Sequence, residues 1–376
     1  MILDDRDVQI DDLLDKMAEE IQLDKTRYDR MVQSYEAVKI WIESDEKFFK
    51  PYLYEVYPHG SVRIKTTVKP LDKDEFDLDI AIHLKADFRN HTPQRIYEEL
   101  KRRLEETERY KRILIPKNRC LRLDYAGDFH MDIMPGIQQS QWDENTIVVP
   151  DKKRGSWVIS NPRGYAEWFK KKTDTVKTPL LEKAMQAERI PADNFKDKKP
   201  LQRAVQLIKR YRDMYFQKDD TYKTSSIILT TIAGEYYEGE SSIFNTIDGI
   251  ITRIVNNIQL LNDRRIKIYN PVNEQEDFTD KWDDKPQYYE EFKKFVRYLY
   301  QEWQELKKKQ GIPEENVIME KLFGREILNK AQVKQAEKIN QLREQNKLGI
   351  SRKTGNLTYS SILGTTTVKT NTFFGN

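Results

Sequence analysis

The chain has 376 residues, enough for two domains or for one bilobal unit with a substantial core. Charged residues make up 34% of it and hydrophobic residues 38%, a balance that favours long helices with solvated faces and excludes disorder. The formal net charge of +3 excludes a strongly basic or acidic protein, so composition neither requires nor rules out a nucleic-acid partner.

Cysteine use and hydropathy indicate a cytoplasmic protein. Cys120 is the only cysteine, so an internal disulfide and a cysteine-rich metal site are both excluded, and a reducing compartment fits best. The N-terminus lacks a basic region followed by an apolar run, and no apolar stretch approaches the ~20 residues that span a bilayer. We therefore expect no signal peptide and no membrane partner.

The first predicted element is a long amphipathic helix over residues 7–48. Apolar residues recur there at three- and four-residue spacing between charged ones: Leu13, Met17, Ile21, Tyr28, Met31, Tyr35 and Val38. Pro51 and Pro58 close this segment. The Gly60-Ser61 pair follows, and a glycine beside a serine lets the backbone approach a phosphate closely, with hydroxyl and amide groups as donors.

Residues 76–84 alternate between apolar and polar side chains, which predicts a strand with one buried face. A period of two places Asp77 and Asp79 together on the opposite face. Two neighbouring carboxylates repel each other and need a cation or solvent between them. Hard oxygen ligands of this kind suit Mg²⁺, which shares its coordination with substrate phosphates.

A helix is expected over 93–109, followed by strands over 120–124 and 129–134 with a turn at 126–128. In the second strand the apolar residues alternate, so Asp132 projects from the other face together with His130. If this strand neighbours the one over 76–84, three carboxylates converge. Three carboxylates can hold two metal ions about 3.5–4 Å apart, the arrangement used for in-line phosphoryl transfer.

From Pro162 onward the pattern is helical. Helices are predicted over 163–171, 201–216, 225–238, 243–261, 287–309 and 314–346, and residues 350–376, rich in Thr, Ser, Asn and Gly, are predicted to form a loose tail. The predicted organisation is an α/β catalytic lobe with the N-terminal helix over 1–160, a helical lobe over 161–349, and the tail over 350–376.

Three segments carry a family resemblance. The run PHGSVR over 58–63, continuing through TTV at 66–68 to EFDLDI at 75–80, resembles the signature of polymerase-β-type nucleotidyltransferases, and more narrowly of the bacterial cGAS/DncV-like enzymes, or CD-NTases. Residues 125–135 (YAGDFHMDIMP) resemble the segment with that family's third aspartate. Residues 270–273 (NPVN), followed by Phe278 and Trp282, resemble a further element of the family's helical lobe.

The resemblance implies an α+β fold, with a polymerase-β-like nucleotidyltransferase core, a mixed sheet, a long N-terminal helix and an oligoadenylate-synthase-like helical C-terminal lobe. It implies a cyclic oligonucleotide synthase of antiphage defence that joins NTPs, ATP or GTP, into a cyclic di- or trinucleotide. Asp77, Asp79 and Asp132 are then the catalytic and metal-binding residues, with Mg²⁺ as cofactor and Mn²⁺ as a substitute.

The same resemblance implies a phosphate-binding set that spans both lobes. Gly60 and Ser61 would hold the donor triphosphate together with Lys209 and Ser226. A helix N-terminus with serine and backbone N–H groups attracts phosphate. A cap role for Ser226 or its neighbour Ser225, and a solvated Lys209, stay open as alternatives.

His59, His83 and His130 are expected to be ordinary hydrogen-bonding residues, because no Cys/His ligand spacing surrounds them. The last residues, 371–376 (NTFFGN), resemble synthase tails that ubiquitin-transfer-like enzymes conjugate to a target, so conjugating or regulatory proteins are candidate partners.

Two other functions stay open. One is a linear oligonucleotide or RNA-end nucleotidyltransferase that uses the same metal site. The absence of an evident basic groove disfavours it, and no stable nucleic-acid partner is expected. The other is an inactive nucleotide-binding scaffold, which the presence of all three carboxylates disfavours.

Overall fold

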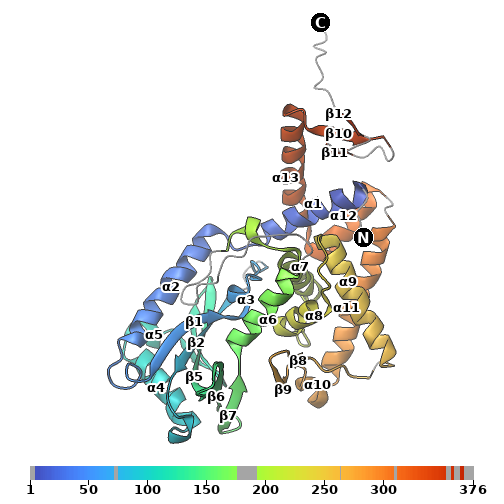
Figure 1. The fold of residues 1–376 in the computed structure, drawn as a ribbon. Helices are drawn as coiled ribbons and strands as arrows, with labels where there is room; N and C mark the ends of the chain where they lie inside the picture. Colours follow the sequence, from blue (N-terminus) through green and yellow to red (C-terminus); the bar gives the residue numbers. More distant parts are fainter. Residues whose placement is uncertain are drawn as a thin grey trace.

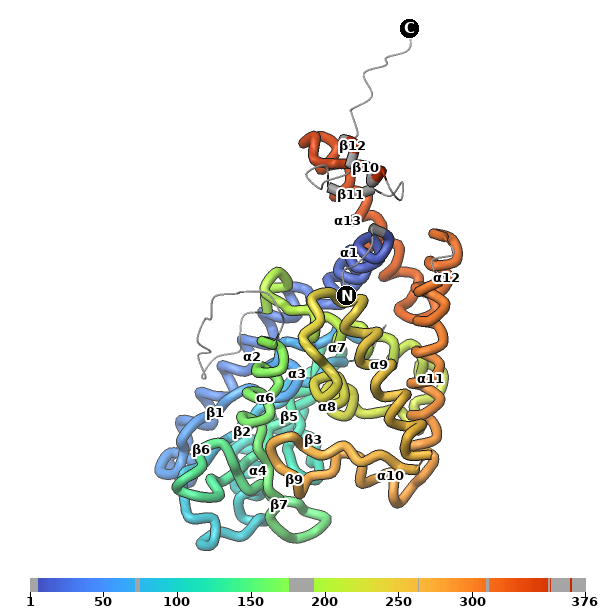
Figure 2. The backbone as a smooth tube through the Cα atoms, turned by 45° about the vertical axis from the view of Figure 1, so that its right-hand side comes forward, coloured from blue at the N-terminus to red at the C-terminus, as the bar shows by residue number. Residues whose placement is uncertain are grey.

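A computed structural model describes residues 5–71, 75–175, 193–262, 264–308, 311–352, 357–359 and 365–367. They form a seven-stranded sheet with helices on one side and a helical bundle on the other (Figure 1). Short α3 and the longer α6 lie between the sheet and the bundle in both views (Figures 1 and 2). The expected α+β architecture with a mixed sheet is confirmed.

The helices are α1 (Asp5–Glu20), α2 (Lys25–Glu43), α3 (Gly60–Arg63), α4 (Pro93–Glu105), α5 (Glu108–Lys111), α6 (Pro162–Asp174), α7 (Pro200–Tyr215), α8 (Ser226–Tyr236), α9 (Ile243–Leu260), α10 (Lys281–Asp284), α11 (Gln287–Lys307), α12 (Ile312–Phe323) and α13 (Arg325–Glu344). The strands are β1 (Leu53–His59), β2 (Phe76–Leu84), β3 (Leu114–Pro116), β4 (Leu121–Tyr125), β5 (Phe129–Ser140), β6 (Asp143–Asp151), β7 (Ser156–Ser160), β8 (Tyr269–Asn270), β9 (Asn273–Asp277), β10 (Leu348–Ser351), β11 (Leu357–Tyr359) and β12 (Thr365–Thr367).

The large sheet has the order β1-β2-β5-β4-β3, with β6 paired to the far half of β5 and β7 paired to β6. Strands β2 and β5 run parallel, and every other pair in this sheet is antiparallel. The parallel pair brings together two segments about fifty positions apart in the chain, joined through α4, α5 and two shorter strands.

The apolar face of the sheet builds one of two hydrophobic cores. Alternate residues of β2, β4 and β5 pack there against apolar residues of α2 and α4. The aromatic rings of Phe76 and Phe129, paired across β2 and β5, stack at 5.3 Å between centroids. Burial of this face forces the polar residues at the intervening positions onto the opposite face, toward the helical bundle.

The second core lies within the bundle, between α1 and helices α6 to α9 and α11 to α13. Helix α1 therefore packs in the helical core, whereas α2 packs on the sheet. Helix α13 lies along α1 and leads to the small sheet β10-β12, at the end of the molecule remote from β1–β7 (Figure 1). The division expected at residue 160 stays a prediction.

Two long predicted helices are each interrupted, so those predictions were wrong in length. The helix expected over 7–48 is two helices, because Asp24 caps a new one by accepting a hydrogen bond from the backbone N–H of Arg27. The helix expected over 314–346 breaks at Gly324, whose φ of +97° is unsuited to a helix.

Other differences concern strands. Strands β1, β3, β6 and β7 were not predicted, although all four belong to the large sheet. Residues 348–351, 357–359 and 365–367 pair as a three-stranded sheet, where a loose tail was predicted. The tail segment 371–376 lies outside the described residues. Among the described helices, none combines the length and the hydrophobicity that a membrane span requires.

Candidate active site

Two parallel strands place the three predicted aspartates on one polar face of the sheet. In the register of β2 with β5, Asp79 lies opposite Asp132 and Asp77 lies opposite His130. All four side chains alternate with buried apolar neighbours on the same strands. The juxtaposition of the aspartates expected from the sequence is thus present in the structure, and their catalytic role remains a prediction.

Strand β4 adds two charged residues to this face that sequence analysis missed. Arg122 lies opposite Asp132, and Asp124 lies opposite His130. The guanidinium of Arg122 binds both oxygens of Asp132, at 2.7 and 2.8 Å, and donates to Oδ1 of Asp77 at 3.2 Å. The guanidinium of Arg122 therefore joins Asp77 to Asp132. Its contact with Asp132 is charge-assisted and bidentate.

The turn after β1 lies against Asp79. His59 pairs with Asp79 in the register of β1 with β2, and Gly60 follows with a φ of +59°. A Cβ at Gly60 would overlap Oδ2 of Asp79 and lie 3.0 Å from its Cγ. Only glycine fits both the left-handed backbone and the close approach. The hydroxyl of Ser61 shares a hydrogen bond of 3.1 Å with that of Thr67.

The pKa values of two of these carboxylates are raised. Burial raises the pKa of Asp79 to about 7, and the charges of Asp77 and Asp132 add to this rise. Burial also raises the pKa of Asp77, with Arg122 opposing the effect. The hydrogen bonds to Asp132 raise the pKa of the Arg122 guanidinium. A site of this kind attracts further positive charge.

Helix α7 faces this site from the bundle. Lys209 is 5% exposed, and its amine donates to the carbonyl and the hydroxyl of Thr66 at 3.1 and 3.0 Å. Burial lowers the pKa of Lys209 to about 7, partly offset by the charge of Asp79. The solvated alternative for Lys209 is therefore wrong. The amine thus contacts the segment between α3 and β2 at Thr66.

One turn further along α7, Arg212 links the bundle to the start of α8. Its guanidinium donates to the hydroxyl of Ser226 at 2.5 Å and to Asp213. Helix α8 begins at Ser226. Its N-cap residue is Ser225, whose side chain makes no cap hydrogen bond. The charge of Arg212 also acts on Asp77. Arg212 thus connects Ser226 to the electrostatics of the aspartates, and sequence analysis missed it.

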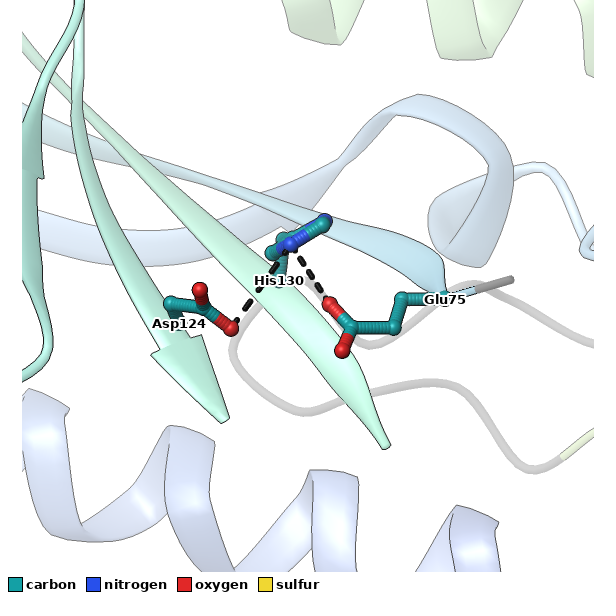
Figure 3. A group of neighbouring side chains, drawn as sticks. All are labelled: Glu75, Asp124 and His130. Carbon is teal, nitrogen blue, oxygen red and sulfur yellow. Dashed lines mark ion pairs between the residues drawn. The ribbon is translucent and has the colours of Figure 1, made fainter. Parts of the chain in front are cut away.

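Two groups on the polar face have ligand atoms for metal ions. Asp77, Asp79 and Asp132 supply only carboxylate oxygens, the donors that Mg²⁺ prefers, and three carboxylates on one face fit a divalent cation. Beside them, ligand atoms of Glu75, Asp124 and His130 all lie within 4.8 Å of one another (Figure 3). Among the described residues, this second group is the one whose potential ligand atoms lie within that distance of one another. In the aspartate group, the guanidinium of Arg122 lies between Asp77 and Asp132.

Register explains why these additional residues were missed. The alternation in residues 121–125 signals that Arg122 and Asp124 share a face, but it does not say which face or which neighbouring strand. Glu75 precedes β2 by one position and has no pattern of its own.

The sequence and the structure are both similar to those of known nucleotide second-messenger synthases. Residues 8–173 match a family model described as the Second Messenger Oligonucleotide or Dinucleotide Synthetase domain. A c-di-GMP synthase of Roseivirga ehrenbergii is 43% identical over 376 residues, all of both chains. The structure resembles the CD-NTase CdnG of Bradyrhizobium diazoefficiens in complex with GTP, with a TM-score of 0.69, 20% identity and coverage of 87% and 98% of the two chains. It also resembles the 3′-deoxy GTP-bound form of Escherichia coli DncV, with a TM-score of 0.56, 14% identity and coverage of 87% and 89%.

Proposed function

The chain belongs to the CD-NTases, the nucleotidyltransferases that make cyclic oligonucleotides, and on this basis we propose that it converts two molecules of GTP into cyclic di-GMP. In each of two steps a ribose hydroxyl oxygen bonds to an α-phosphorus, the bond from that phosphorus to the β-phosphate oxygen breaks, and pyrophosphate leaves. The hydroxyl proton is released. The second step closes the ring.

The end-to-end match with a c-di-GMP synthase at 43% identity is the observation that carries the choice of product. The geometry supports the same class of reaction, because phosphoryl transfer depends mainly on positioning and on charge stabilisation. The face that holds Asp77, Asp79 and Asp132 offers negative charge for cations, and Lys209 and Arg212 lie across from it.

In this proposal Asp77, Asp79 and Asp132 hold Mg²⁺, with Mn²⁺ as a substitute. The bound metal would supply Lewis-acid stabilisation of the transferring phosphoryl group and of the leaving pyrophosphate. The protein's own part is to orient the three carboxylates. Arg122 does this for Asp132 through its bidentate contact, and Gly60 leaves room for Asp79.

Gly60, Ser61, Lys209 and Ser226 form the proposed binding set for the donor triphosphate. Lys209 donates hydrogen bonds to Thr66, and the next residue, Thr67, shares a hydrogen bond with Ser61. The hydroxyl of Ser226 accepts a hydrogen bond from the guanidinium of Arg212. The planar guanidinium group has a geometry suited to phosphate oxygens. We propose that these groups orient the α-phosphate for attack.

Incubation with each labelled NTP, alone and in pairs, with Mg²⁺ or Mn²⁺ tests the proposal. The products are treated with phosphatase and identified by mass spectrometry. GTP alone should yield a phosphatase-resistant product with the mass of cyclic di-GMP. A phosphatase-sensitive linear product would support the oligonucleotide or RNA-end alternative, and no product under any condition would support the scaffold alternative.

Three further expectations are proposals of the same standing. They are a role in antiphage defence, a cytoplasmic location, and conjugating or regulatory proteins that act on residues 371–376, outside the described residues. As in the sequence analysis, we expect no stable nucleic-acid partner.

A further inference from the structure

The donor atoms of His130 and of two carboxylates, Glu75 and Asp124, lie close together (Figure 3). Because His130 is paired with Asp77 in the register of β5 with β2, this group lies beside the aspartates. Nε2 of His130 lies 2.5 Å from Oε2 of Glu75 and 3.7 Å from Oδ1 of Asp124. His130 comes from β5, Asp124 from the neighbouring β4, and Glu75 from the residue before β2. Three separate chain segments thus direct donor atoms at one point.

The donor atoms are held in place from outside the group. Oε1 of Glu75 accepts a hydrogen bond from the backbone N–H of Gly127, which fixes the orientation of this carboxylate. Asp124 and His130 are paired in the register of β4 with β5, so their backbones cannot slide past each other.

Asp124 is the member of the group that the protein alone does not satisfy. Its Oδ1 is shielded from solvent and, among the described residues, accepts no hydrogen bond. A shielded carboxylate oxygen without a hydrogen-bond partner is unfavourable. Nε2 of His130 lies 3.7 Å from this oxygen and closer, at 2.5 Å, to Oε2 of Glu75. A cation among the three residues would satisfy this oxygen.

The other ring nitrogen of His130 lies near a second carboxylate. Nδ1 faces Oδ1 of Asp77 at 3.7 Å. Metal-bound histidines almost always direct their second ring nitrogen at a carboxylate, a carbonyl or water, which sets the tautomer and the ring orientation. Here that carboxylate belongs to the neighbouring aspartate group.

From this geometry we infer that Glu75, Asp124 and His130 bind a divalent first-row transition-metal ion, of the Mn²⁺ or Zn²⁺ kind, in preference to Mg²⁺. Imidazole nitrogen suits transition metals, whereas Mg²⁺ favours oxygen donors. Metal–ligand bonds of about 2.0–2.2 Å place neighbouring donors roughly 3–4 Å apart. The separation of His130 from Asp124 already lies in this range, and Glu75 needs to withdraw slightly through its flexible side chain.

Pulsed EPR of Mn²⁺ bound to the full chain tests this site without relying on activity. Mg²⁺ in excess occupies the aspartate group, and a ¹⁴N hyperfine coupling then reports only Mn²⁺ that is bound to an imidazole. The expected result is one nitrogen-coupled Mn²⁺ per chain that persists in excess Mg²⁺. Equilibrium dialysis gives the affinity.

Substitutions identify the ligands. His130→Asn should abolish the nitrogen coupling, and Asp124→Asn should weaken Mn²⁺ binding about tenfold or more. His91→Asn, on a histidine remote from the sheet face, is the matched control and should change neither. Circular dichroism and thermal unfolding verify folding, and Glu75→Gln replaces any variant that fails to fold.

Three results would overturn the inference: no nitrogen coupling in the wild-type chain, a coupling that survives in His130→Asn, or displacement of the bound Mn²⁺ by equimolar Mg²⁺. The site is independent of the proposed function. Asp79→Asn should stop nucleotidyl transfer while leaving the nitrogen-coupled ion in place, so failure of one claim is distinguishable from failure of the other.

Discussion

Replacement of Gly60 by alanine separates two consequences of the close approach between the β1 turn and Asp79. Gly60 has a φ of +59°, and an alanine there costs about 1–2 kcal/mol of stability, because L-residues disfavour the left-handed region. In addition, the new Cβ would overlap Oδ2 of Asp79 and lie 3.0 Å from Cγ and 3.3 Å from Cβ of that residue. The carboxylate must therefore move.

A displacement of about 1 Å at a group that positions reactants lowers catalytic rates about a hundredfold. We therefore expect Gly60→Ala to unfold in urea with a free energy about 1–2 kcal/mol below wild type, and to lose about two orders of magnitude in turnover. Turnover is measured as the rate at which labelled GTP becomes phosphatase-resistant product at saturating Mg²⁺.

Gly155 provides the matched control. Its φ is +62°, nearly the same as that of Gly60, but a Cβ there would meet nothing within 4 Å. Gly155→Ala should lose a similar amount of stability and keep its turnover. If both variants turn over alike, the close contact between Gly60 and Asp79 has no part in the reaction, and the reasoning is refuted.

Four further outcomes are expected. Asp77→Asn combined with Asp79→Asn should abolish product while circular dichroism stays that of the wild type; retained turnover would contradict the metal assignment. Because burial raises the pKa of Asp79 from 3.8 to about 7, the folded state binds more protons than the unfolded state in that window. In EDTA, stability measured by urea unfolding should thus fall as pH rises from about 4 to 7, and Asp79→Asn should flatten this fall. Arg122→Met should lower metal-free stability by about 2 kcal/mol and increase the thermal stabilisation by Mg²⁺, because it leaves Asp132 without its cation; an unchanged Mg²⁺ effect would count against this. Lys209→Met should lower turnover at least tenfold, whereas normal turnover in a folded Lys209→Met protein would exclude Lys209 from the donor site.

The central strands were predictable because their burial leaves a strong local pattern. Strand β2 was expected over 76–84 and has those bounds, with Asp77 and Asp79 on the polar face. The start of β5 was expected as well, with Asp132 on the polar face. In both strands one face is buried in the apolar core, so alternation in the sequence reports directly on the structure.

What the sequence could not supply is the partner of each strand. The pairing of Asp79 with Asp132 depends on a parallel register between segments separated by α4 and two shorter strands. The positions of Arg122 and His130 beside the aspartates follow from the same register. Local alternation is compatible with many registers, and tertiary packing selects one.

The predicted helix boundaries were wrong for a different reason. Periodicity continues across residues 21–24 and across Gly324, so the apolar pattern alone favours continuous helices. The capping contact of Asp24 and the left-handed backbone of Gly324 decide otherwise, and both act over only a few residues. Lys209 was placed from the resemblance, but its burial against Thr66 emerges only from the packing of α7 on the loop before β2.

The most direct test of the account is a crystal structure with Mn²⁺ and a non-hydrolysable GTP analogue, with anomalous scattering recorded at the manganese edge. We expect anomalous peaks within about 2.0–2.3 Å of carboxylate oxygens of Asp77, Asp79 and Asp132, next to the triphosphate. A triphosphate bound elsewhere, or three aspartates without a manganese peak while nucleotide is present, would contradict it.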